Sequence, residues 1–156
     1  MTLKRRTFLQ RTLATSTVAM AASAGLLAPR AVFAEWPKNA FMAKGVPEAL
    51  TGLLGTTSAN DSDQIKIKAP DIAENGAVVP VTVSTSLDNV ESISIVASAN
   101  NQPLTSNYIL PPGTEAFVST RIKMAKTSDV IAVVKAGGNI YTTKKEVKVT
   151  IGGCGG

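Results

Sequence analysis

The residue with the clearest chemical potential is a single cysteine near the C-terminus. The chain ends Ile151-Gly152-Gly153-Cys154-Gly155-Gly156, so paired glycines flank the thiol on both sides. A lone cysteine has no partner for an internal disulfide. Cys154 also lies three residues beyond the last apolar strand position, where core packing is not expected. We therefore predict that Cys154 is an accessible attachment site for a covalently held group.

The four glycines Gly152, Gly153, Gly155 and Gly156 are interpreted as a flexible carrier arm for this thiol. Glycine combines backbone freedom with the smallest cross-section, so such an arm fits a narrow channel that would exclude bulkier segments. At about 3.3 to 3.6 Å per residue, an extended arm carries the sulfur roughly 10 Å beyond Ile151. A tethered substrate requires this combination of flexibility, small cross-section and reach.

The arm contains no group that would activate its own thiol. It has no Lys, Arg or His, and no helix N-terminus precedes it, although low thiolate pKa values depend on such positive or dipolar neighbours. The hypothesis is that a partner enzyme activates Cys154 when it receives the arm. A strongly acid-shifted thiol in the isolated protein would argue against this hypothesis.

The rest of the sequence excludes most familiar catalytic sites. It contains no histidine, which removes Ser-His-Asp triads, Cys-His proteases and histidine zinc sites. No glycine cluster lies between a strand and a helix as phosphate-binding loops require, and the carboxylates are scattered among turns and strand ends. We predict no catalytic residue, no metal and no cofactor; a copper site would need ligands beyond one thiolate and a methionine.

Residues 1–34 have the pattern of a signal peptide. This segment carries five basic residues and no acid, with an uncharged stretch rich in Ala, Ser, Thr and Leu that is too short and weakly apolar for a membrane anchor. Cleavage after about Ala34 and a periplasmic location are expected. The sequence Lys4–Gln10 resembles a twin-arginine signal, although Lys4 and Gln10 depart from it, so the general secretory route stays open.

Removal of this segment also removes the excess of positive charge. Five of the 16 Lys and Arg residues lie in it, which leaves 11 against 11 Asp and Glu. A nucleic-acid or anionic-membrane partner would require a concentrated basic surface. The short cluster Lys144, Lys145 and Lys148 is better explained as the solvated face of a strand, so neither partner is expected.

The exported part is predicted to be one domain with a helical beginning. Residues 35–63 are interpreted as a helical segment, interrupted near Gly45, and a polar linker. Residues 64–151 show about seven segments in which apolar and polar residues alternate, separated by turn sequences such as Gly137-Gly138-Asn139. This spacing predicts an all-β, antiparallel, immunoglobulin-like β-sandwich, followed by the arm at 152–156.

One predicted strand lacks a polar face. Val130-Ile131-Ala132-Val133-Val134 is apolar on both sides, whereas a sandwich strand usually exposes one side to water. Either the N-terminal helical segment or a partner subunit is expected to cover the second face.

The terminal Gly-Gly-Cys-Gly-Gly sequence, the twin-arginine-like leader and the β-rich domain together resemble the SoxY family of the bacterial thiosulfate-oxidising Sox system. The resemblance implies a carrier in which Cys154 holds sulfur intermediates, and it implies a heterodimer with a SoxZ-like subunit. It also implies transient partners: the SoxAX cytochrome, which couples thiosulfate to the cysteine oxidatively, the SoxB hydrolase, which releases sulfate, and a sulfur dehydrogenase as an optional further partner.

Alternative interpretations of the same features remain open at this stage. Cys154 could crosslink an exported structural or adhesive domain through a disulfide between two copies, or it could be incidental in a frayed tail. Gly155-Gly156 could act as a terminal diglycine like that of ubiquitin-like sulfur carriers, but no ATP-dependent activating system is expected outside the cytoplasm. Intermolecular disulfides without sulfur adducts would favour the structural interpretation.

Overall fold

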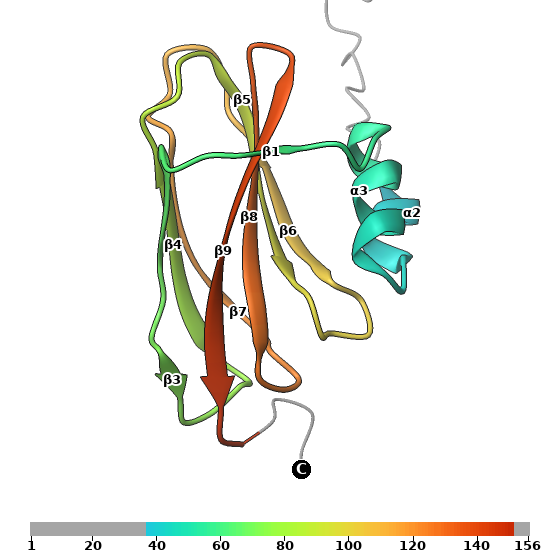
Figure 1. Ribbon diagram of the computed structural model, residues 1–156, viewed down its shortest axis with the longest axis vertical. Coiled ribbons are helices and arrows are strands. Elements are labelled where there is room, and N and C mark those ends of the chain that lie inside the picture. The colour runs from blue at the N-terminus through green and yellow to red at the C-terminus, as the bar shows by residue number, and fades with distance from the viewer. Residues whose placement is uncertain (1–36, 152–156) are drawn as a thin grey trace, which may run out of the picture. The chain divides into compact units, whose positions relative to one another are not determined.

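The computed structural model describes residues 37–151, within which there are two helices and nine strands (Figure 1). The helices are α2 (Lys38–Met42) and α3 (Val46–Leu54). The strands are β1 (Asn60–Asp61), β2 (Ile65–Lys68), β3 (Ile72–Ala73), β4 (Val79–Thr85), β5 (Val90–Ala97), β6 (Leu104–Ile109), β7 (Phe117–Ile122), β8 (Ser128–Ala136) and β9 (Asn139–Val149).

The helical segment has the interruption that the sequence predicts. Gly45 is the N-cap of α3, and Pro47 lies in the first turn, where its missing N–H costs no hydrogen bond. Gly55 ends the helix with φ of 76° and donates its N–H to the carbonyl oxygen of Thr51 at 2.9 Å. A residue with a Cβ would be strained in this left-handed conformation.

The strands form two sheets that pack face to face. The larger sheet has the order β1-β9-β8-β5-β6, with β3 also paired to β9, and the smaller has the order β2-β4-β7. The longer strands pair antiparallel, and burial alternates along β4, where Val79, Val81 and Val83 point inward. The predicted antiparallel β-sandwich preceded by a short helical segment is confirmed.

Two short strands were not predicted. β1 and β3 each pair in parallel with β9, through Asn60 with Tyr141 and through Ile72 with Lys148. Both contain only two residues, which is too short for an alternating pattern, and β1 falls in the segment interpreted as a polar linker. Together they occupy both ends of this edge of β9, which shortens the stretch that could pair with another chain.

The core lies between the two sheets and reaches the last turn before β8. Its fully buried side chains come from both layers and from the β7–β8 connection: Val79, Val81, Val83, Ile93, Ile95, Met124, Val130, Val134 and Val147. Close packing in a continuous apolar layer of this kind makes the sandwich, β9 included, rigid.

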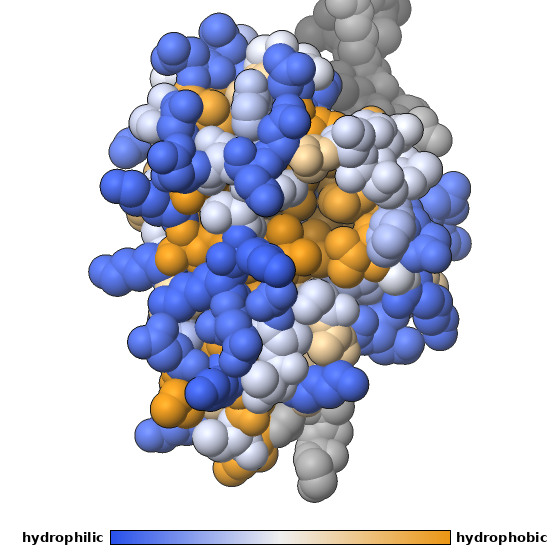
Figure 2. Space-filling view, in the orientation of Figure 1, coloured by the Kyte–Doolittle hydropathy of each residue, from blue (hydrophilic) through white to orange (hydrophobic). Residues whose placement is uncertain are grey.

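The second apolar face of β8 is covered in part by the helices. Val133 and Val96 on the outer side of the larger sheet pack with Ala40, Ala49 and Leu50 of α2 and α3. Other apolar side chains at this contact, Ile131 and Ile140 among them, stay partly exposed. Figure 2 shows apolar surface between the polar residues of β9 and the helices, so the cover is incomplete.

Candidate functional site

The five residues of the predicted arm, Gly152–Gly156 with Cys154 in the middle, lie outside the residues that the structure describes. Their roles stay predictions. The structure does describe the base from which the arm begins: β9 ends at Val149, and Ile151 follows it with 62% of its side chain exposed. The arm therefore begins at the surface of the body and not in its core.

One side of this base is held by the segment that contains β3. The N–H of Thr150 donates to the carbonyl oxygen of Ala73 at 3.1 Å, and the Thr150 hydroxyl donates to that of Glu74 at 3.0 Å. The N–H of Gly76 then donates to the carbonyl oxygen of Ile151 at 2.8 Å. Hydrogen bonds thus continue to the last described residue.

The other side is held by the connection between β7 and β8. The N–H of Val149 donates to the Thr127 hydroxyl at 2.9 Å. The N–H of Met124 donates to the carbonyl oxygen of Gly76 at 2.7 Å, and the Met124 side chain is fully buried. A buried anchor in the core therefore fixes the position of the loop that supports the arm.

A third loop joins the same group through one asparagine. The side-chain amide of Asn100 donates to the carbonyl oxygen of Lys123 at 2.7 Å, and its oxygen accepts from the N–H of Ala125 at 2.8 Å. We call the loops 74–78, 98–103 and 123–127, together with Ile151, the arm end of the sandwich. Main-chain carbonyl and N–H groups supply most of its hydrogen bonds.

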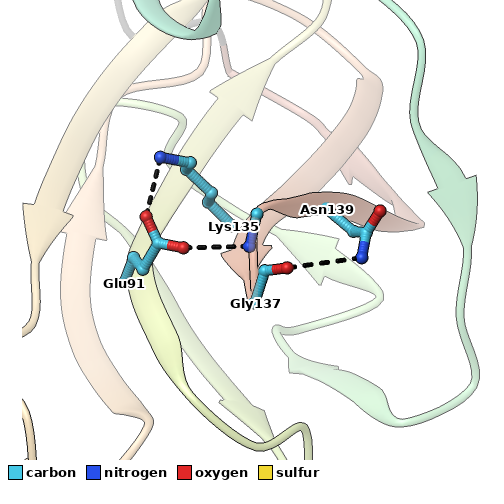
Figure 3. A network of polar contacts seen from close by, with 5 residues as sticks. Glu91, Lys135, Gly137 and Asn139 are labelled. Carbon is cyan, nitrogen blue, oxygen red and sulfur yellow. Dashed lines mark hydrogen bonds and ion pairs between the residues drawn. The ribbon is translucent and has the colours of Figure 1, made fainter.

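The opposite end of the sandwich is built differently. β9 is 11 residues long, so at about 3.3 Å per residue it separates the two ends by roughly 35 Å. Here the Glu91 carboxylate lies 2.7 Å from the Lys135 amine and accepts the N–H of Gly138 at 3.0 Å (Figure 3). We call the loops 86–89, 110–116 and 137–138 the hairpin end.

These contacts affect the ionisation of Glu91. The hydrogen bond from Lys135, followed by that from the Gly138 N–H, holds the pKa of the Glu91 carboxyl below its ordinary value of 4.5. Both partners stabilise the charged form. The site therefore joins the start of β5 to the β8–β9 turn, at the end of β9 opposite to Ile151.

The hairpin end also contains a cavity of about 740 Å³, lined by residues 85–91 and by Ile109, Leu110 and residues 112–116. Its volume lies in the range of small-molecule sites. However, this cavity lies at the start of β9, whereas Ile151 and the base of the arm follow its end. The size of the cavity is therefore no evidence that it is the site of the predicted chemistry.

Sequence reasoning did not find the residues that support the arm. Asn75-Gly76 and Asn100-Asn101 are recognisable turn sequences, but nothing in them indicates that Gly76 and Asn100 meet the end of β9 and the β7–β8 loop. These contacts join positions far apart in the chain, and local turn chemistry carries no such information.

Within residues 37–151, no three His, Cys, Asp or Glu side chains gather in a way that could hold a metal ion. In the same range, neither helix has the length and apolar character of a membrane span.

Comparison with solved structures finds proteins of high and of low sequence identity to this chain. The sulfur carrier protein SoxY from Chlorobium limicola f thiosulfatophilum is 46% identical, with a TM-score of 0.61, over 66% of this chain and 94% of that one. The superoxide reductase (neelaredoxin) from Ignicoccus hospitalis is 18% identical, with a TM-score of 0.52, over 63% of this chain and 97% of that one. The second likeness concerns the fold alone.

The sequence was compared with curated proteins and with family models, and only the family models gave a match. No curated protein sequence matches the chain. The model of the sulfur oxidation protein SoxY matches residues 50–154, a range that covers about two thirds of the chain and ends at the cysteine. With this match and the structural one, the chain belongs to the SoxY family.

Proposed function

We propose that the protein is a sulfur carrier in thiosulfate oxidation, and that it holds sulfur intermediates covalently on Cys154. Family membership and the 46% identity to a sulfur carrier protein support the carrier role. The observation that carries the assignment to Cys154 is the sequence itself. The chain's one cysteine lies between paired glycines, five residues after the end of β9, and hydrogen bonds fasten the residues that follow this strand to the body.

The attachment chemistry is an oxidative coupling. The Cys154 thiol and thiosulfate combine to form Cys154–S–S–SO3⁻, with release of one proton and two electrons to an electron acceptor. Water then attacks the terminal sulfone group, which leaves as sulfate with two protons, and a persulfide anion stays on the cysteine. Each step needs a catalyst or an electron acceptor that a glycine arm does not contain.

We infer that these catalysts are partner proteins and that the chain itself is not an enzyme. A SoxAX-type cytochrome accepts the electrons of the coupling, a SoxB-type hydrolase releases the sulfate, and a sulfur dehydrogenase is an optional further partner. The arm end supports this division of roles, since its hydrogen bonds fix where the arm begins. A fixed origin with a free tip raises the effective concentration of the thiol at a docked partner.

A SoxZ-like subunit is proposed as the stable partner. The apolar surface between β9 and the helices, which includes Ile131 and Ile140, supports this proposal because incompletely covered apolar strips often mark interfaces. Export to the periplasm with cleavage after about Ala34 completes the proposal, with the basic leader of residues 1–34 as its support.

Intact mass spectrometry of the protein purified from thiosulfate-fed cells tests the function. We expect additions of thiosulfate and sulfur mass that disappear on treatment with a reductant. The Cys154→Ser variant should show none of these additions and should unfold at the same temperature as the native protein, because no packing is lost.

The crosslinking interpretation predicts a different mass spectrum. Disulfide dimers without any sulfur or thiosulfate addition, in cells that are actively oxidising thiosulfate, would support a structural role and contradict the proposed one. Dimers together with adducts are compatible with a carrier, because a loaded or free thiol can form a disulfide as a side reaction.

A further inference from the structure

The turn between β3 and β4 contains the chain's one Asn-Gly sequence, Asn75-Gly76. In such a sequence the main-chain nitrogen of the glycine can attack the side-chain carbonyl carbon of the asparagine, because glycine has no Cβ that hinders the approach. The asparagine then loses ammonia and becomes an aspartate or an isoaspartate. Whether this reaction proceeds in a folded protein depends on how the two residues are held.

The side chain of Asn75 is arranged in a way that favours the reaction. Its side-chain oxygen accepts the N–H of Ala77 at 2.8 Å, which is the hydrogen bond of an Asx turn and folds the side chain back over the following main chain. The bond also draws electrons from the side-chain carbonyl group, and its carbon becomes a better target for a nucleophile. Asn75 is exposed, so water reaches it.

The attacking nitrogen, by contrast, is held in place by the base of the arm. Gly76 is buried, and its N–H donates to the carbonyl oxygen of Ile151 at 2.8 Å. Its own carbonyl oxygen accepts the N–H of Met124 at 2.7 Å. The attack requires removal of the Gly76 amide proton, and a buried, hydrogen-bonded N–H loses its proton to base only after a local opening.

Thr150 holds Ile151 against this turn. The N–H of Thr150 donates to the carbonyl oxygen of Ala73 at 3.1 Å, and its hydroxyl donates to that of Glu74 at 3.0 Å. Hydrogen bonds therefore fasten the residues on both sides of Asn75 to the end of the described chain. The Gly76 nitrogen becomes available only when this contact opens.

We propose that Asn75 is a self-modification site and that the fastened base of the arm keeps it unreacted. When Ile151 leaves Gly76, the Gly76 nitrogen bonds to the side-chain carbonyl carbon of Asn75. The side-chain amide nitrogen leaves as ammonia and takes the Gly76 proton with it. Water then opens the cyclic imide and gives a carboxylate and a proton.

This reaction changes the base of the arm permanently, because the ammonia is lost. An isoaspartate adds one methylene group to the main chain before Gly76, which moves Gly76 relative to Ile151 and Met124. An aspartate adds a negative charge beside the carbonyl groups of the same turn. A base that stays fastened is therefore protected, and a base that is released often becomes loosened for good.

Deamidation and hydrogen exchange, measured on the same exported protein, test this inference. Both reactions begin with loss of the Gly76 amide proton, so the native fold should slow both by the same factor relative to concentrated urea. Amide NMR gives the exchange rate of Gly76, and peptide mass spectrometry locates the conversion at Asn75. Asn75→Gln should show no conversion at this position, because its longer side chain closes the ring far more slowly.

A matched pair of threonine variants assigns the protection to the base of the arm. Thr150→Val removes the hydroxyl that bonds to the β3–β4 turn, and Thr142→Val removes a hydroxyl that donates to the Asp61 carboxylate at 3.1 Å, near the opposite end of β9. Loss of one hydrogen bond shifts a local opening by about fivefold. Thr150→Val should accelerate both reactions by this factor, and Thr142→Val should change neither.

Two outcomes would overturn the inference. One is conversion of Asn75 in the native protein as fast as in urea, since the contact with Ile151 would then give no protection. The other is faster exchange at Gly76 in Thr150→Val without faster conversion of Asn75. The remaining amide signals show whether each variant has folded, and the comparison of native protein with urea needs no variant. Since the test involves neither Cys154 nor sulfur adducts, its failure leaves the carrier function intact.

Discussion

The arm end and the hairpin end of the sandwich are held together by different interactions. At the hairpin end, one carboxylate, Glu91, joins an ion pair and a main-chain N–H, next to two glycines with positive φ. At the arm end, neutral hydrogen bonds link Gly76, Ile151 and Met124. The positive charges there, by contrast, remain outside these bonds.

The two ends also differ in whether their charged side chains form ion pairs. In the Glu91–Lys135 pair, each charge has an opposite partner at the surface of the body. Lys123 and Lys126 of the arm end form no ion pair within residues 37–151. The two ends therefore differ in that an ion pair belongs to the hydrogen-bond network of the hairpin end, and neutral groups alone form that of the arm end.

The largest expected effect comes from the buried anchor of the arm end. Met124→Ala removes a fully buried side chain, and large-to-small changes of this kind cost about 2 to 5 kcal/mol. Met42→Ala is the matched control, because the side chain of Met42 is 55% exposed. Urea unfolding of both variants measures the difference. Equal losses would show that Met124 is not an anchor.

The loop 98–103 of the arm end should respond to Asn100→Ala. The variant loses two side-chain hydrogen bonds to the β7–β8 loop, which together contribute about 2 kcal/mol. Hydrogen exchange at the Ala125 amide should accelerate, since its acceptor is removed. Asn101→Ala should leave this amide protected, and an unchanged exchange rate in Asn100→Ala would argue against the link.

These two variants also show what sequence could not provide. The alternating pattern from Ile65 to Val149 was sufficient to predict seven strands and the sandwich, because burial of one face imposes a period of two. The same alternation continues through Val118 and Ile122 to Met124, so the burial of Met124 agrees with the pattern, although the residue lies beyond the end of β7. Its role depends on a main-chain contact with Gly76, which no local pattern reveals.

Of the candidate site, the sequence predicts the cysteine arm but not the contacts that hold its base. Cys154 and its glycines are recognisable because they break the strand pattern, and the family match extends to this cysteine. The hydrogen bonds that hold the base of the arm were not recognisable, because Gly76 and Thr127 come from loops far from Ile151 and Val149 in the sequence.

At the hairpin end, Gly138→Ala should cost less than either change above. Gly138 has φ of 77°, and no atom lies within 4 Å of the position of an added Cβ. The cost is therefore backbone strain alone, about 1 kcal/mol. Gly138→Asn should cost less, because asparagine tolerates this conformation. Thermal unfolding of the pair checks this order, and the reverse order would show that strain is not the cause.

The smallest effect is expected from Glu91→Gln, and it should depend on pH. Because the pKa of Glu91 is lowered in the folded protein from its ordinary value of 4.5, its stabilising contribution is present above pH 4.5 and is lost as the pH falls through the lowered pKa. The variant should be slightly less stable than the native protein at pH 7 and equally stable in acid. A constant difference from pH 7 to pH 2 would contradict the assignment.

The central claim, that the body supports an arm whose cysteine carries the cargo, is tested most directly by locating the cargo. Trypsin cleaves after Lys148 and releases residues 149–156, which contain Cys154. In protein from thiosulfate-fed cells, digested without reductant, we predict that this peptide alone carries thiosulfate or sulfur mass. Unmodified peptide 149–156 from cells that are oxidising thiosulfate would contradict the account.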